Sequence, residues 1–482
     1  MRSETPNNER RGRGRPQTAE RMERERRLRP VAGPVLLWAL GVGCVISGSY
    51  YGWNFGLAAT GYWGFLAALG FAAVLYAALS AAMAELVSAI PHTGGPYAFA
   101  SLALGRTAGF VTGIGVVMEY VIGSAAVACA IGAYVNVLLP AVPLIISATV
   151  VYAVFIAIHL RGAGTSLKLE VVFTAIASGV LVIFYAVGIP NMTMANLNEV
   201  GGGAMFPNGF GGFWSALPLA AWFFLGIEGL PMAAEEAHNP TRDVPRALLL
   251  SFLTLLAMGV FTLTVATGLG GAHEVGQAAA PLPTAARAGL GEDSLMVGVL
   301  SIFGLSGLLA SFNSVVFAYS RQVFALSRTG YLPRFLCRVN RRGSPTFALT
   351  IPAIVGLSLV GIGANTPGAG IPVLVSMSVV GAAVSYVMTM LAAIRLRRTR
   401  PDLVRPFKVP GGQATAFAGL MLAAFLLPAT VQHFPIAVLL AALVFVGLLA
   451  YYVLYSRRRL LSRSIEEELE VLRESGEELT GL

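Results

Sequence analysis

The chain has 482 residues, of which 56% are hydrophobic and only 12% are charged. This composition excludes a soluble globular protein, because such proteins do not carry many apolar runs long enough to cross a bilayer. The runs are continuous rather than alternating, which also excludes an outer-membrane barrel. The formal net charge of +9 is therefore interpreted through membrane topology, and no nucleic-acid partner is expected.

The first 30 residues and the last 26 differ from the rest of the chain. Residues 1–30 are polar and carry ten arginines without apolar periodicity, which predicts a disordered basic arm in the cytoplasm. Residues 457–482 begin basic and turn acidic, and we expect them to form a cytoplasmic tail.

Between these ends lie twelve apolar runs, each long enough to cross a bilayer as a helix. Their approximate limits are 34–59, 62–90, 107–139, 142–159, 168–189, 212–237, 246–270, 294–326, 347–363, 370–395, 414–430 and 434–456. With the N-terminus inside, the outer connections carry only Arg287, whereas the inner ones are rich in lysine and arginine. The sequence thus predicts a multi-pass plasma-membrane protein with both termini in the cytoplasm.

The first run, 34–59, contains Ser47, Gly48 and Ser49 near its middle. They lie about 20 Å beyond Pro34 at helical rise, close to the bilayer midplane. Glycine and serine weaken a helix interior, and irregular backbone at this depth is tolerated only when it is buried in protein or lines a cavity. The alternative interpretation is close helix packing through GxxxG spacing.

The sixth run, 212–237, has a second weak point at a similar depth. Gly226, Gly229 and Pro231 bracket Glu228, and proline removes a backbone donor, so the helix is expected to break there. Interruptions five spans apart indicate an inverted repeat with a substrate site between them. We expect repeat one over about 34–189, repeat two over about 212–395, and two extra helices over about 414–456.

Glu119 lies in the third run, about 20 Å from Arg106, on a helical face of small residues. A carboxyl group at this depth is costly and suggests function, although a structural hydrogen-bonding role is the alternative. In the eighth run, Ser311 and Ser314 could ligate a cation or merely bond the preceding turn.

Three further glutamates, Glu85, Glu235 and Glu236, lie near the cytoplasmic ends of their runs. We expect them to cap helices or to pair with Arg242 and Arg246. The three cysteines and five histidines are scattered without ligand spacing, so no disulfide framework, metal or cofactor is expected.

The order of these features resembles the amino acid–polyamine–organocation (APC) superfamily of transporters. The resemblance covers the chain from Gly33 to about Arg458. The motifs that carry it are Ile46-Ser-Gly-Ser49, Ile90-Pro-His-Thr-Gly-Gly-Pro-Tyr97, Phe224-Leu-Gly-Ile-Glu228, Asn239-Pro240, Tyr319-Ser-Arg-Gln-Val-Phe-Ala-Leu-Ser-Arg-Thr-Gly-Tyr-Leu-Pro333 and Arg405-Pro-Phe-Lys-Val-Pro410. Within the superfamily, Gly226-Ile-Glu-Gly229 looks most like the ethanolamine permease branch.

The resemblance implies an all-α, leucine-transporter-like fold with a 5+5 inverted repeat and broken helices one and six. Glu228 would carry a coupling proton, and an aromatic side chain before the second break would gate the site. Residues 174–179 lack the lysine of some proton-coupled members, so protons and sodium both remain open as coupling ions. With Glu119 added, the expected substrate site comprises Ser47, Gly48, Ser49, Glu119, Trp222, Phe223, Gly226 and Glu228.

The resemblance implies secondary active import of a small amine, with ethanolamine first, and the buried charges agree with a net cationic substrate. No lysine or arginine lies at middle depth, whereas Glu119 and Glu228 both do, and a buried cation requires a negative partner. An amino acid permease, or an antiporter of amino acids and amines, is the alternative. An intramembrane enzyme is not expected, because no span offers a nucleophile–base pair or metal ligands.

Overall fold

The computed structural model describes residues 30–364, 370–458 and 460. The predicted arm, apart from its last residue, and most of the predicted tail lie outside these residues. The described part of the chain is helical, and its β-pairing is limited to two isolated bridges, Ala32 with Ala237 and Val339 with Pro345.

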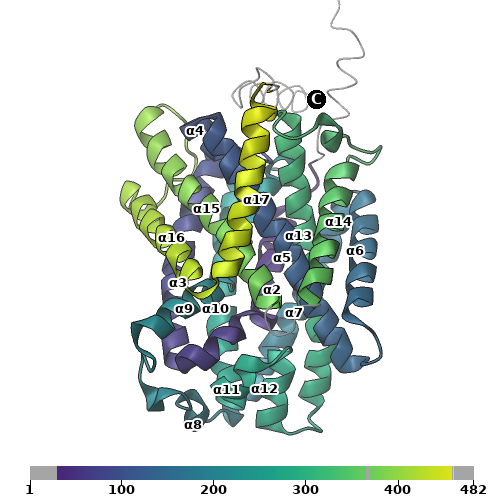
Figure 1. Cartoon of the computed structure of the whole chain (residues 1–482), viewed down its shortest axis with the longest axis vertical. Coiled ribbons are helices and arrows are strands. Elements are labelled where there is room, and N and C mark those ends of the chain that lie inside the picture. Colours follow the sequence, from purple (N-terminus) through teal and green to yellow (C-terminus); the bar gives the residue numbers. More distant parts are fainter. Residues whose placement is uncertain (1–29, 365–369, 459, 461–482) are drawn as a thin grey trace, which may run out of the picture.

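The long helices run roughly parallel along the long axis of one bundle (Figure 1). Their bounds are α2 Pro34–Tyr50, α3 Leu57–Ala89, α5 Arg106–Leu138, α6 Leu144–Leu160, α7 Ala163–Gly188, α9 Gly209–Ala221, α10 Pro240–Gly270, α13 Leu295–Arg328, α14 Thr346–Ala364, α15 Gly370–Thr399, α16 Gln413–His433 and α17 Pro435–Leu454. The short helices are α4 Pro96–Leu104, α8 Met194–Leu197, α11 Ala272–Gln277 and α12 Pro281–Leu290, and the main 3₁₀ segments are η1 Trp53–Gly56, η4 Ile227–Glu236 and η5 Arg334–Cys337. Helices α8, α11 and α12 lie at the end of the bundle opposite the chain's C-terminus (Figure 1).

Nine helices in the described residues are long and apolar enough to cross a membrane, and α2 and α6 are shorter apolar helices. The predicted all-helical membrane class is therefore confirmed. Helix α5 is the most deeply enclosed of the nine, since almost all of its apolar stretch is buried. It touches α15 backbone to backbone: a Cβ on Gly115 would lie 2.7 Å from the Gly381 carbonyl oxygen. This contact brings the middle of α5 beside the middle of α15.

The first predicted span is interrupted, but later than the sequence predicted. Ser47, Gly48 and Ser49 all remain inside α2, which ends at Tyr50. The chain leaves the helix where Tyr51 is extended (φ −165°, ψ 152°) and continues through Gly52, whose positive φ of 95° suits glycine. The predicted position was wrong because a hydroxyl group from α13 bridges the weak turn of α2, as described below.

The sixth predicted span is divided between α9 and η4. Gly226 joins the two in the left-handed region, with φ 103°, and a Cβ there would come within 3.3 Å of the Cys44 carbonyl oxygen in α2. Glycine therefore permits both the turn and the close approach to α2. Glu228 lies in the first turn of η4, so this joint positions it.

The three glutamates that the sequence places near the ends of their apolar runs pair with arginines that are remote in sequence. Glu235 binds Arg328 at 2.8 Å, and Glu236 binds Arg321 at 2.7 Å with both side chains 1% exposed. The third, in α3, is bound by two arginines, Arg397 of α15 and Arg405. The predicted pairing with Arg242 and Arg246 was wrong, because these carboxylates bind arginines of α13, of α15 and of the segment that follows α15.

Candidate functional site

Two glutamates from different elements meet at one tyrosine in the bundle interior. Glu119 in α5 is 2% exposed, and Glu228 in η4 is fully buried. The Tyr386 hydroxyl of α15 lies 3.0 Å from Glu228 Oε2 and 3.4 Å from Glu119 Oε1. The Tyr76 hydroxyl lies 3.2 Å from that of Tyr386 and extends the network into α3.

The other oxygen of Glu228 is held by Tyr120, the residue that follows Glu119 in α5. The Tyr120 hydroxyl lies 3.1 Å from Glu228 Oε1 and 2.9 Å from the Gly226 carbonyl oxygen. Both carboxyl oxygens of Glu228 therefore have hydrogen-bond partners, and the Tyr120 contact also fixes the left-handed joint before η4.

Glu119 is less well satisfied than Glu228. No N–H or O–H donor among the described residues reaches its buried Oε2 atom, Oε1 has only the long contact to the Tyr386 hydroxyl, and the carboxyl group lies against that of Glu228. Glu119 borders a central cavity of about 20 Å³, which is roughly enough for one water molecule or an ammonium group. The residues that line it are Cys44, Ser47, Glu119, Tyr120, Gly123, Val127, Trp222, Leu225, Gly226, Val315 and Ser378.

The described part of the chain provides no salt bridge from a basic side chain to Glu119 or Glu228. Two carboxyl groups that share one hydroxyl in a buried site cannot both be ionised without a compensating cation. The arrangement can therefore hold a proton between the two groups or accept a small cation beside them.

A hydroxyl group of α13 is inserted into α2 next to this cavity. The Ser47 N–H donates to Ser311 Oγ at 2.9 Å, and Ser311 Oγ donates to the Gly43 carbonyl oxygen at 2.7 Å. In a regular α-helix this N–H and this carbonyl would bond each other directly. Ser311 therefore bridges the weak turn of α2 and ties it to α13.

One further buried glutamate, beside α2, was missed by the sequence analysis. Glu170 of α7 is fully buried and accepts a 2.6 Å hydrogen bond from Asn313 Nδ2, while Thr174 Oγ1 lies 3.3 Å from its other oxygen. A Cβ on Gly43 would overlap its carboxyl group, so the glutamate sits directly on α2. It escaped notice because it lies only two residues after the predicted start of its span.

The neighbouring hydroxyl groups also face carbonyl oxygens of α2. Ser314 Oγ lies 3.4 Å from the Leu40 oxygen, and Thr174 Oγ1 lies 3.3 Å from the Ala39 oxygen. This second polar cluster, formed by Glu170, Thr174 and Ser314 around α2, is separate from the Glu119 cavity. No group of three or more metal-type ligands (His, Cys, Asp or Glu) occurs in the part of the chain that the structure describes.

The remaining predicted site residues fall into two groups. Trp222 lines the cavity and donates from Nε1 to the Tyr51 carbonyl at 2.9 Å, at the point where the chain leaves α2. Gly48 packs against the backbone of Trp222, since a Cβ on Gly48 would come within 2.5 Å of the Trp222 carbonyl oxygen. Ser49 and Phe223 are buried but do not line the cavity, and the Phe223 ring instead packs 5.4 Å from that of Trp53.

The structure thus brings Ser47, Glu119, Trp222 and Gly226 to one cavity, with Glu228 bonded at its edge through Tyr120. The sequence analysis missed Tyr120 and Tyr386, which join the two carboxyl groups. A bundle of apolar helices around a buried cavity, with a carboxyl group on its wall and interrupted helices beside it, is found in membrane transporters. Comparison with known proteins identifies which kind.

The chain belongs to the amino acid permease family, whose model matches residues 34–463. It is 31% identical over 389 residues to an uncharacterized transporter, R00093, of Rhizobium meliloti, which covers 78% of this chain and 80% of the relative. It is 26% identical to the branched-chain amino acid permease BcaP of Bacillus subtilis, over 80% of this chain and 84% of the relative. The aromatic amino acid transport protein AroP of Escherichia coli is 28% identical, over 66% and 71% respectively.

Among solved structures, a manganese transporter of Eremococcus coleocola shares the fold with a TM-score of 0.56. The sequences are 16% identical, and the match covers 88% of this chain and 94% of that transporter. Because its relatives are permeases, the protein is a multi-pass membrane transporter and not an enzyme.

Proposed function

We propose that this protein is a secondary active transporter that imports a small cationic amine, with ethanolamine as the first candidate. The observation that carries the proposal is the buried pair of carboxyl groups of Glu119 and Glu228 at a cavity of about 20 Å³, in which Oε2 of Glu119 receives no hydrogen bond from an N–H or O–H donor of the described residues. A buried carboxyl oxygen without a donor is costly, and the ammonium group of an amine would satisfy it.

The charge around the cavity supports a net cationic substrate. Glu119 and Glu228 supply two carboxyl groups, and the residues that line the cavity include no lysine or arginine. A zwitterionic amino acid would also need donors for its carboxylate, and the nearest backbone donor in α2, the Ser47 N–H, is already bonded to Ser311. An amino alcohol needs only a hydroxyl contact, which Ser47 offers on the same cavity wall.

Coupling is proposed at two places. Glu228 would carry a proton, since its carboxyl group shares a hydroxyl with Glu119 and arrival of a cation would favour release of that proton. Ser311 and Ser314 would belong to a separate cation site, in which Glu170 provides the charge and α2 carbonyls provide further oxygens. Hard oxygen ligands of this kind suit a proton or a sodium ion better than a transition metal.

Alternating access would use the two interrupted helices. The joints at Gly52 and Gly226, where φ is positive, separate α2 from η1 and α9 from η4, and helix interruptions of this kind mark transporter substrate sites. Trp222 bonds the chain where it leaves α2 and would act as the gate, with Phe223 packed behind it. We infer twelve spans, ten of them in two inverted repeats of five and two extra at the C-terminal end, with the arginine-rich arm and both termini in the cytoplasm.

An amino acid permease is the second candidate, because BcaP and AroP carry amino acid transport in their names. For an amino acid to bind, its carboxylate would have to displace Ser311 from the Ser47 N–H. Removing the Ser311 hydroxyl would therefore free a donor for the carboxylate of an amino acid, whereas an amine has no carboxylate that could use this donor.

A competition assay in proteoliposomes separates the two candidates. Uptake of radiolabelled ethanolamine would be measured against a tenfold excess of unlabelled ethanolamine, leucine, phenylalanine or choline. The proposal expects ethanolamine to compete best. If a neutral α-amino acid competes better than ethanolamine, the amine assignment is wrong and the amino acid permease is favoured.

A further inference from the structure

A second, much larger cavity lies away from the Glu119 site. It has a volume of about 550 Å³ and is bordered by the start of α2, the turn between α6 and α7, and the loop between α13 and α14. The residues that line it are Val31, Leu36, Arg161, Gly162, Ala163, Gly164, Thr165, Lys168, Glu236, Arg341, Arg342 and Gly343. Nothing in the proposed transport cycle uses it.

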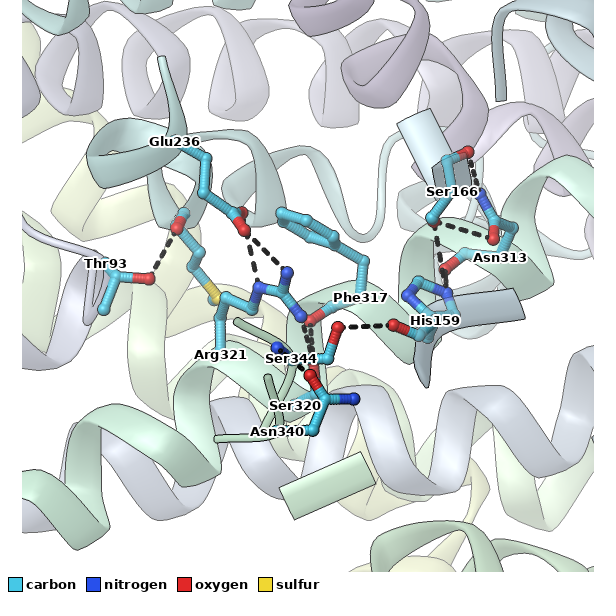
Figure 2. Close-up of polar contacts among 11 residues, drawn as sticks. Thr93, His159, Ser166, Glu236, Asn313, Phe317, Ser320, Arg321, Asn340 and Ser344 are labelled. Atoms are coloured by element: carbon cyan, nitrogen blue, oxygen red, sulfur yellow. Dashed lines mark hydrogen bonds and ion pairs between the residues drawn. The ribbon is translucent and has the colours of Figure 1, made fainter. Parts of the chain in front are cut away.

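Four cations border this cavity and lack acidic partners. Arg161, Lys168, Arg341 and Arg342 form no salt bridge within the described residues. The one acidic side chain on the wall, Glu236, is bound through both carboxyl oxygens by Arg321, so its charge is compensated (Figure 2). Among the described residues, the positive charge on the wall of the cavity is therefore uncompensated.

The wall that holds two of these arginines is fixed in place. Asn340 Nδ2 donates to the Leu160 carbonyl at 2.8 Å. Ser344 Oγ donates to the His159 carbonyl at 2.6 Å (Figure 2). These bonds pin both ends of the loop to the last turn of α6. Arg341 and Arg342 lie between the pinned residues, so the loop presents them beside the α6–α7 turn.

The backbone at the start of α7 adds partial positive charge to the same cavity. Gly162 precedes the helix with φ 116° and offers no side chain to cap it. Within the described residues, the N–H groups of Ala163 and Gly164 in the first turn of this 26-residue helix have no backbone acceptor, and both residues line the cavity. Helix N-termini of this kind favour phosphate and other anions.

We propose that this cavity is a binding site for a phosphate-bearing anion, with an anionic phospholipid headgroup as its natural source. The apolar wall of Val31 and Leu36 would lie against the glycerol and upper acyl chain, and the four cations would surround the phosphate. Basic pockets at the cytoplasmic ends of transmembrane helices are suited to such headgroups. A volume of about 550 Å³ exceeds what an inorganic anion needs and suits a substituted phosphate.

The test measures ligand-induced thermal stabilisation of the purified full-length protein in a neutral detergent. The probes are dioctanoyl phosphatidylglycerol, dioctanoyl phosphatidylcholine and inorganic phosphate, with ionic strength held constant by chloride. Phosphatidylglycerol is expected to raise the unfolding midpoint of the wild type in a saturable manner. If inorganic phosphate saturates the same site equally well, the source is a soluble phosphate; if only the lipid does, the source is the headgroup.

The pocket is tested by paired substitutions. Arg161→Gln with Arg342→Gln should raise the half-saturating concentration of phosphatidylglycerol at least tenfold, since two of four charges are lost. Lys168→Gln with Arg341→Gln is a second pair with the same expectation, in case the first pair does not fold.

The control pair is Arg395→Gln with Arg398→Gln, two exposed arginines at the end of α15, which should change the concentration less than twofold. The proposal is overturned if neither phosphate nor phosphatidylglycerol stabilises the wild type, or if the control pair weakens binding as much as the pocket pairs do.

Discussion

Replacing Glu119 by glutamine removes the negative charge that we propose as the partner of the substrate's ammonium group, and it keeps the size of the side chain. In the structure, no donor among the described residues reaches Oε2, Oε1 has a 3.4 Å contact to Tyr386, and the carboxyl group lies against that of Glu228, so the substitution removes at most one weak hydrogen bond and the contact between two carboxyl groups. The expected loss of stability is about 1 kcal/mol or less, as for one weak hydrogen bond. The cost to substrate binding should be much larger.

Removing one partner of a buried charge pair costs about 2–5 kcal/mol. This range corresponds to a loss of affinity from roughly 30-fold to several thousand-fold. Binding of radiolabelled ethanolamine to purified Glu119→Gln protein would be measured by scintillation proximity, with thermal unfolding as the check on folding. Glu292→Gln is the control, because Glu292 is 79% exposed and pairs only with Arg287 at the protein surface.

The reasoning is refuted if Glu119→Gln binds ethanolamine within threefold of the wild type. It is also refuted if the Glu292→Gln control loses as much affinity, since the effect would then not depend on the cavity. A Glu119→Gln protein that unfolds far below the wild type would show that the side chain is mainly structural.

Three further predictions follow from the same structure. Glu228→Gln should abolish stimulation of uptake by an imposed pH gradient while substrate binding persists, because the titratable group is removed and the Tyr120 contact can remain. Ser311→Ala should lower the free energy of unfolding by about 1–3 kcal/mol, since two buried backbone groups of α2 lose their bridge, whereas Ser301→Ala in the same helix removes only a local bond. A cysteine at position 203 (Gly203→Cys) should react with an impermeant thiol reagent from outside, and one at position 343 (Gly343→Cys) should not.

Each of these predictions has a result that contradicts it. Wild-type pH dependence in Glu228→Gln would remove that residue from coupling. Equal destabilisation by the two serine variants would show that the bridge to α2 has no special role. Labelling of position 343 but not 203 from outside would reverse the proposed topology, and the buried native cysteines provide the unlabelled background.

The membrane class could be predicted because it rests on composition and on runs of apolar residues, which are properties of the sequence itself. The proximity of Glu119 and Glu228 was also accessible, since the rise of a helix gives the depth of each residue. The tyrosine hydroxyl groups that join these two glutamates could not be predicted from the sequence. Tyr120 and Tyr386 are indistinguishable in sequence from aromatic residues that merely fill a helical core.

The sequence-based predictions were wrong where a side chain forms a hydrogen bond or an ion pair with an element that is remote in sequence. The weak turn of α2 stays helical through Ser49 because Ser311, 264 residues beyond Ser47, supplies the missing bond. Glu236 pairs with Arg321, 85 residues away, although nearer arginines exist. Local propensity cannot report such contacts, because they depend on which helices the fold sets side by side.

Concentrative uptake is the measurement that tests the central claim most directly. Purified protein would be reconstituted into proteoliposomes without nucleotide, and radiolabelled ethanolamine and leucine would be offered separately under an inward proton gradient or an inward sodium gradient. We predict that ethanolamine accumulates above its external concentration in response to one of the gradients, and that Glu119→Gln abolishes this accumulation. Accumulation of leucine without accumulation of ethanolamine would contradict a cationic amine as the substrate, and equilibration of both without accumulation would contradict secondary active transport.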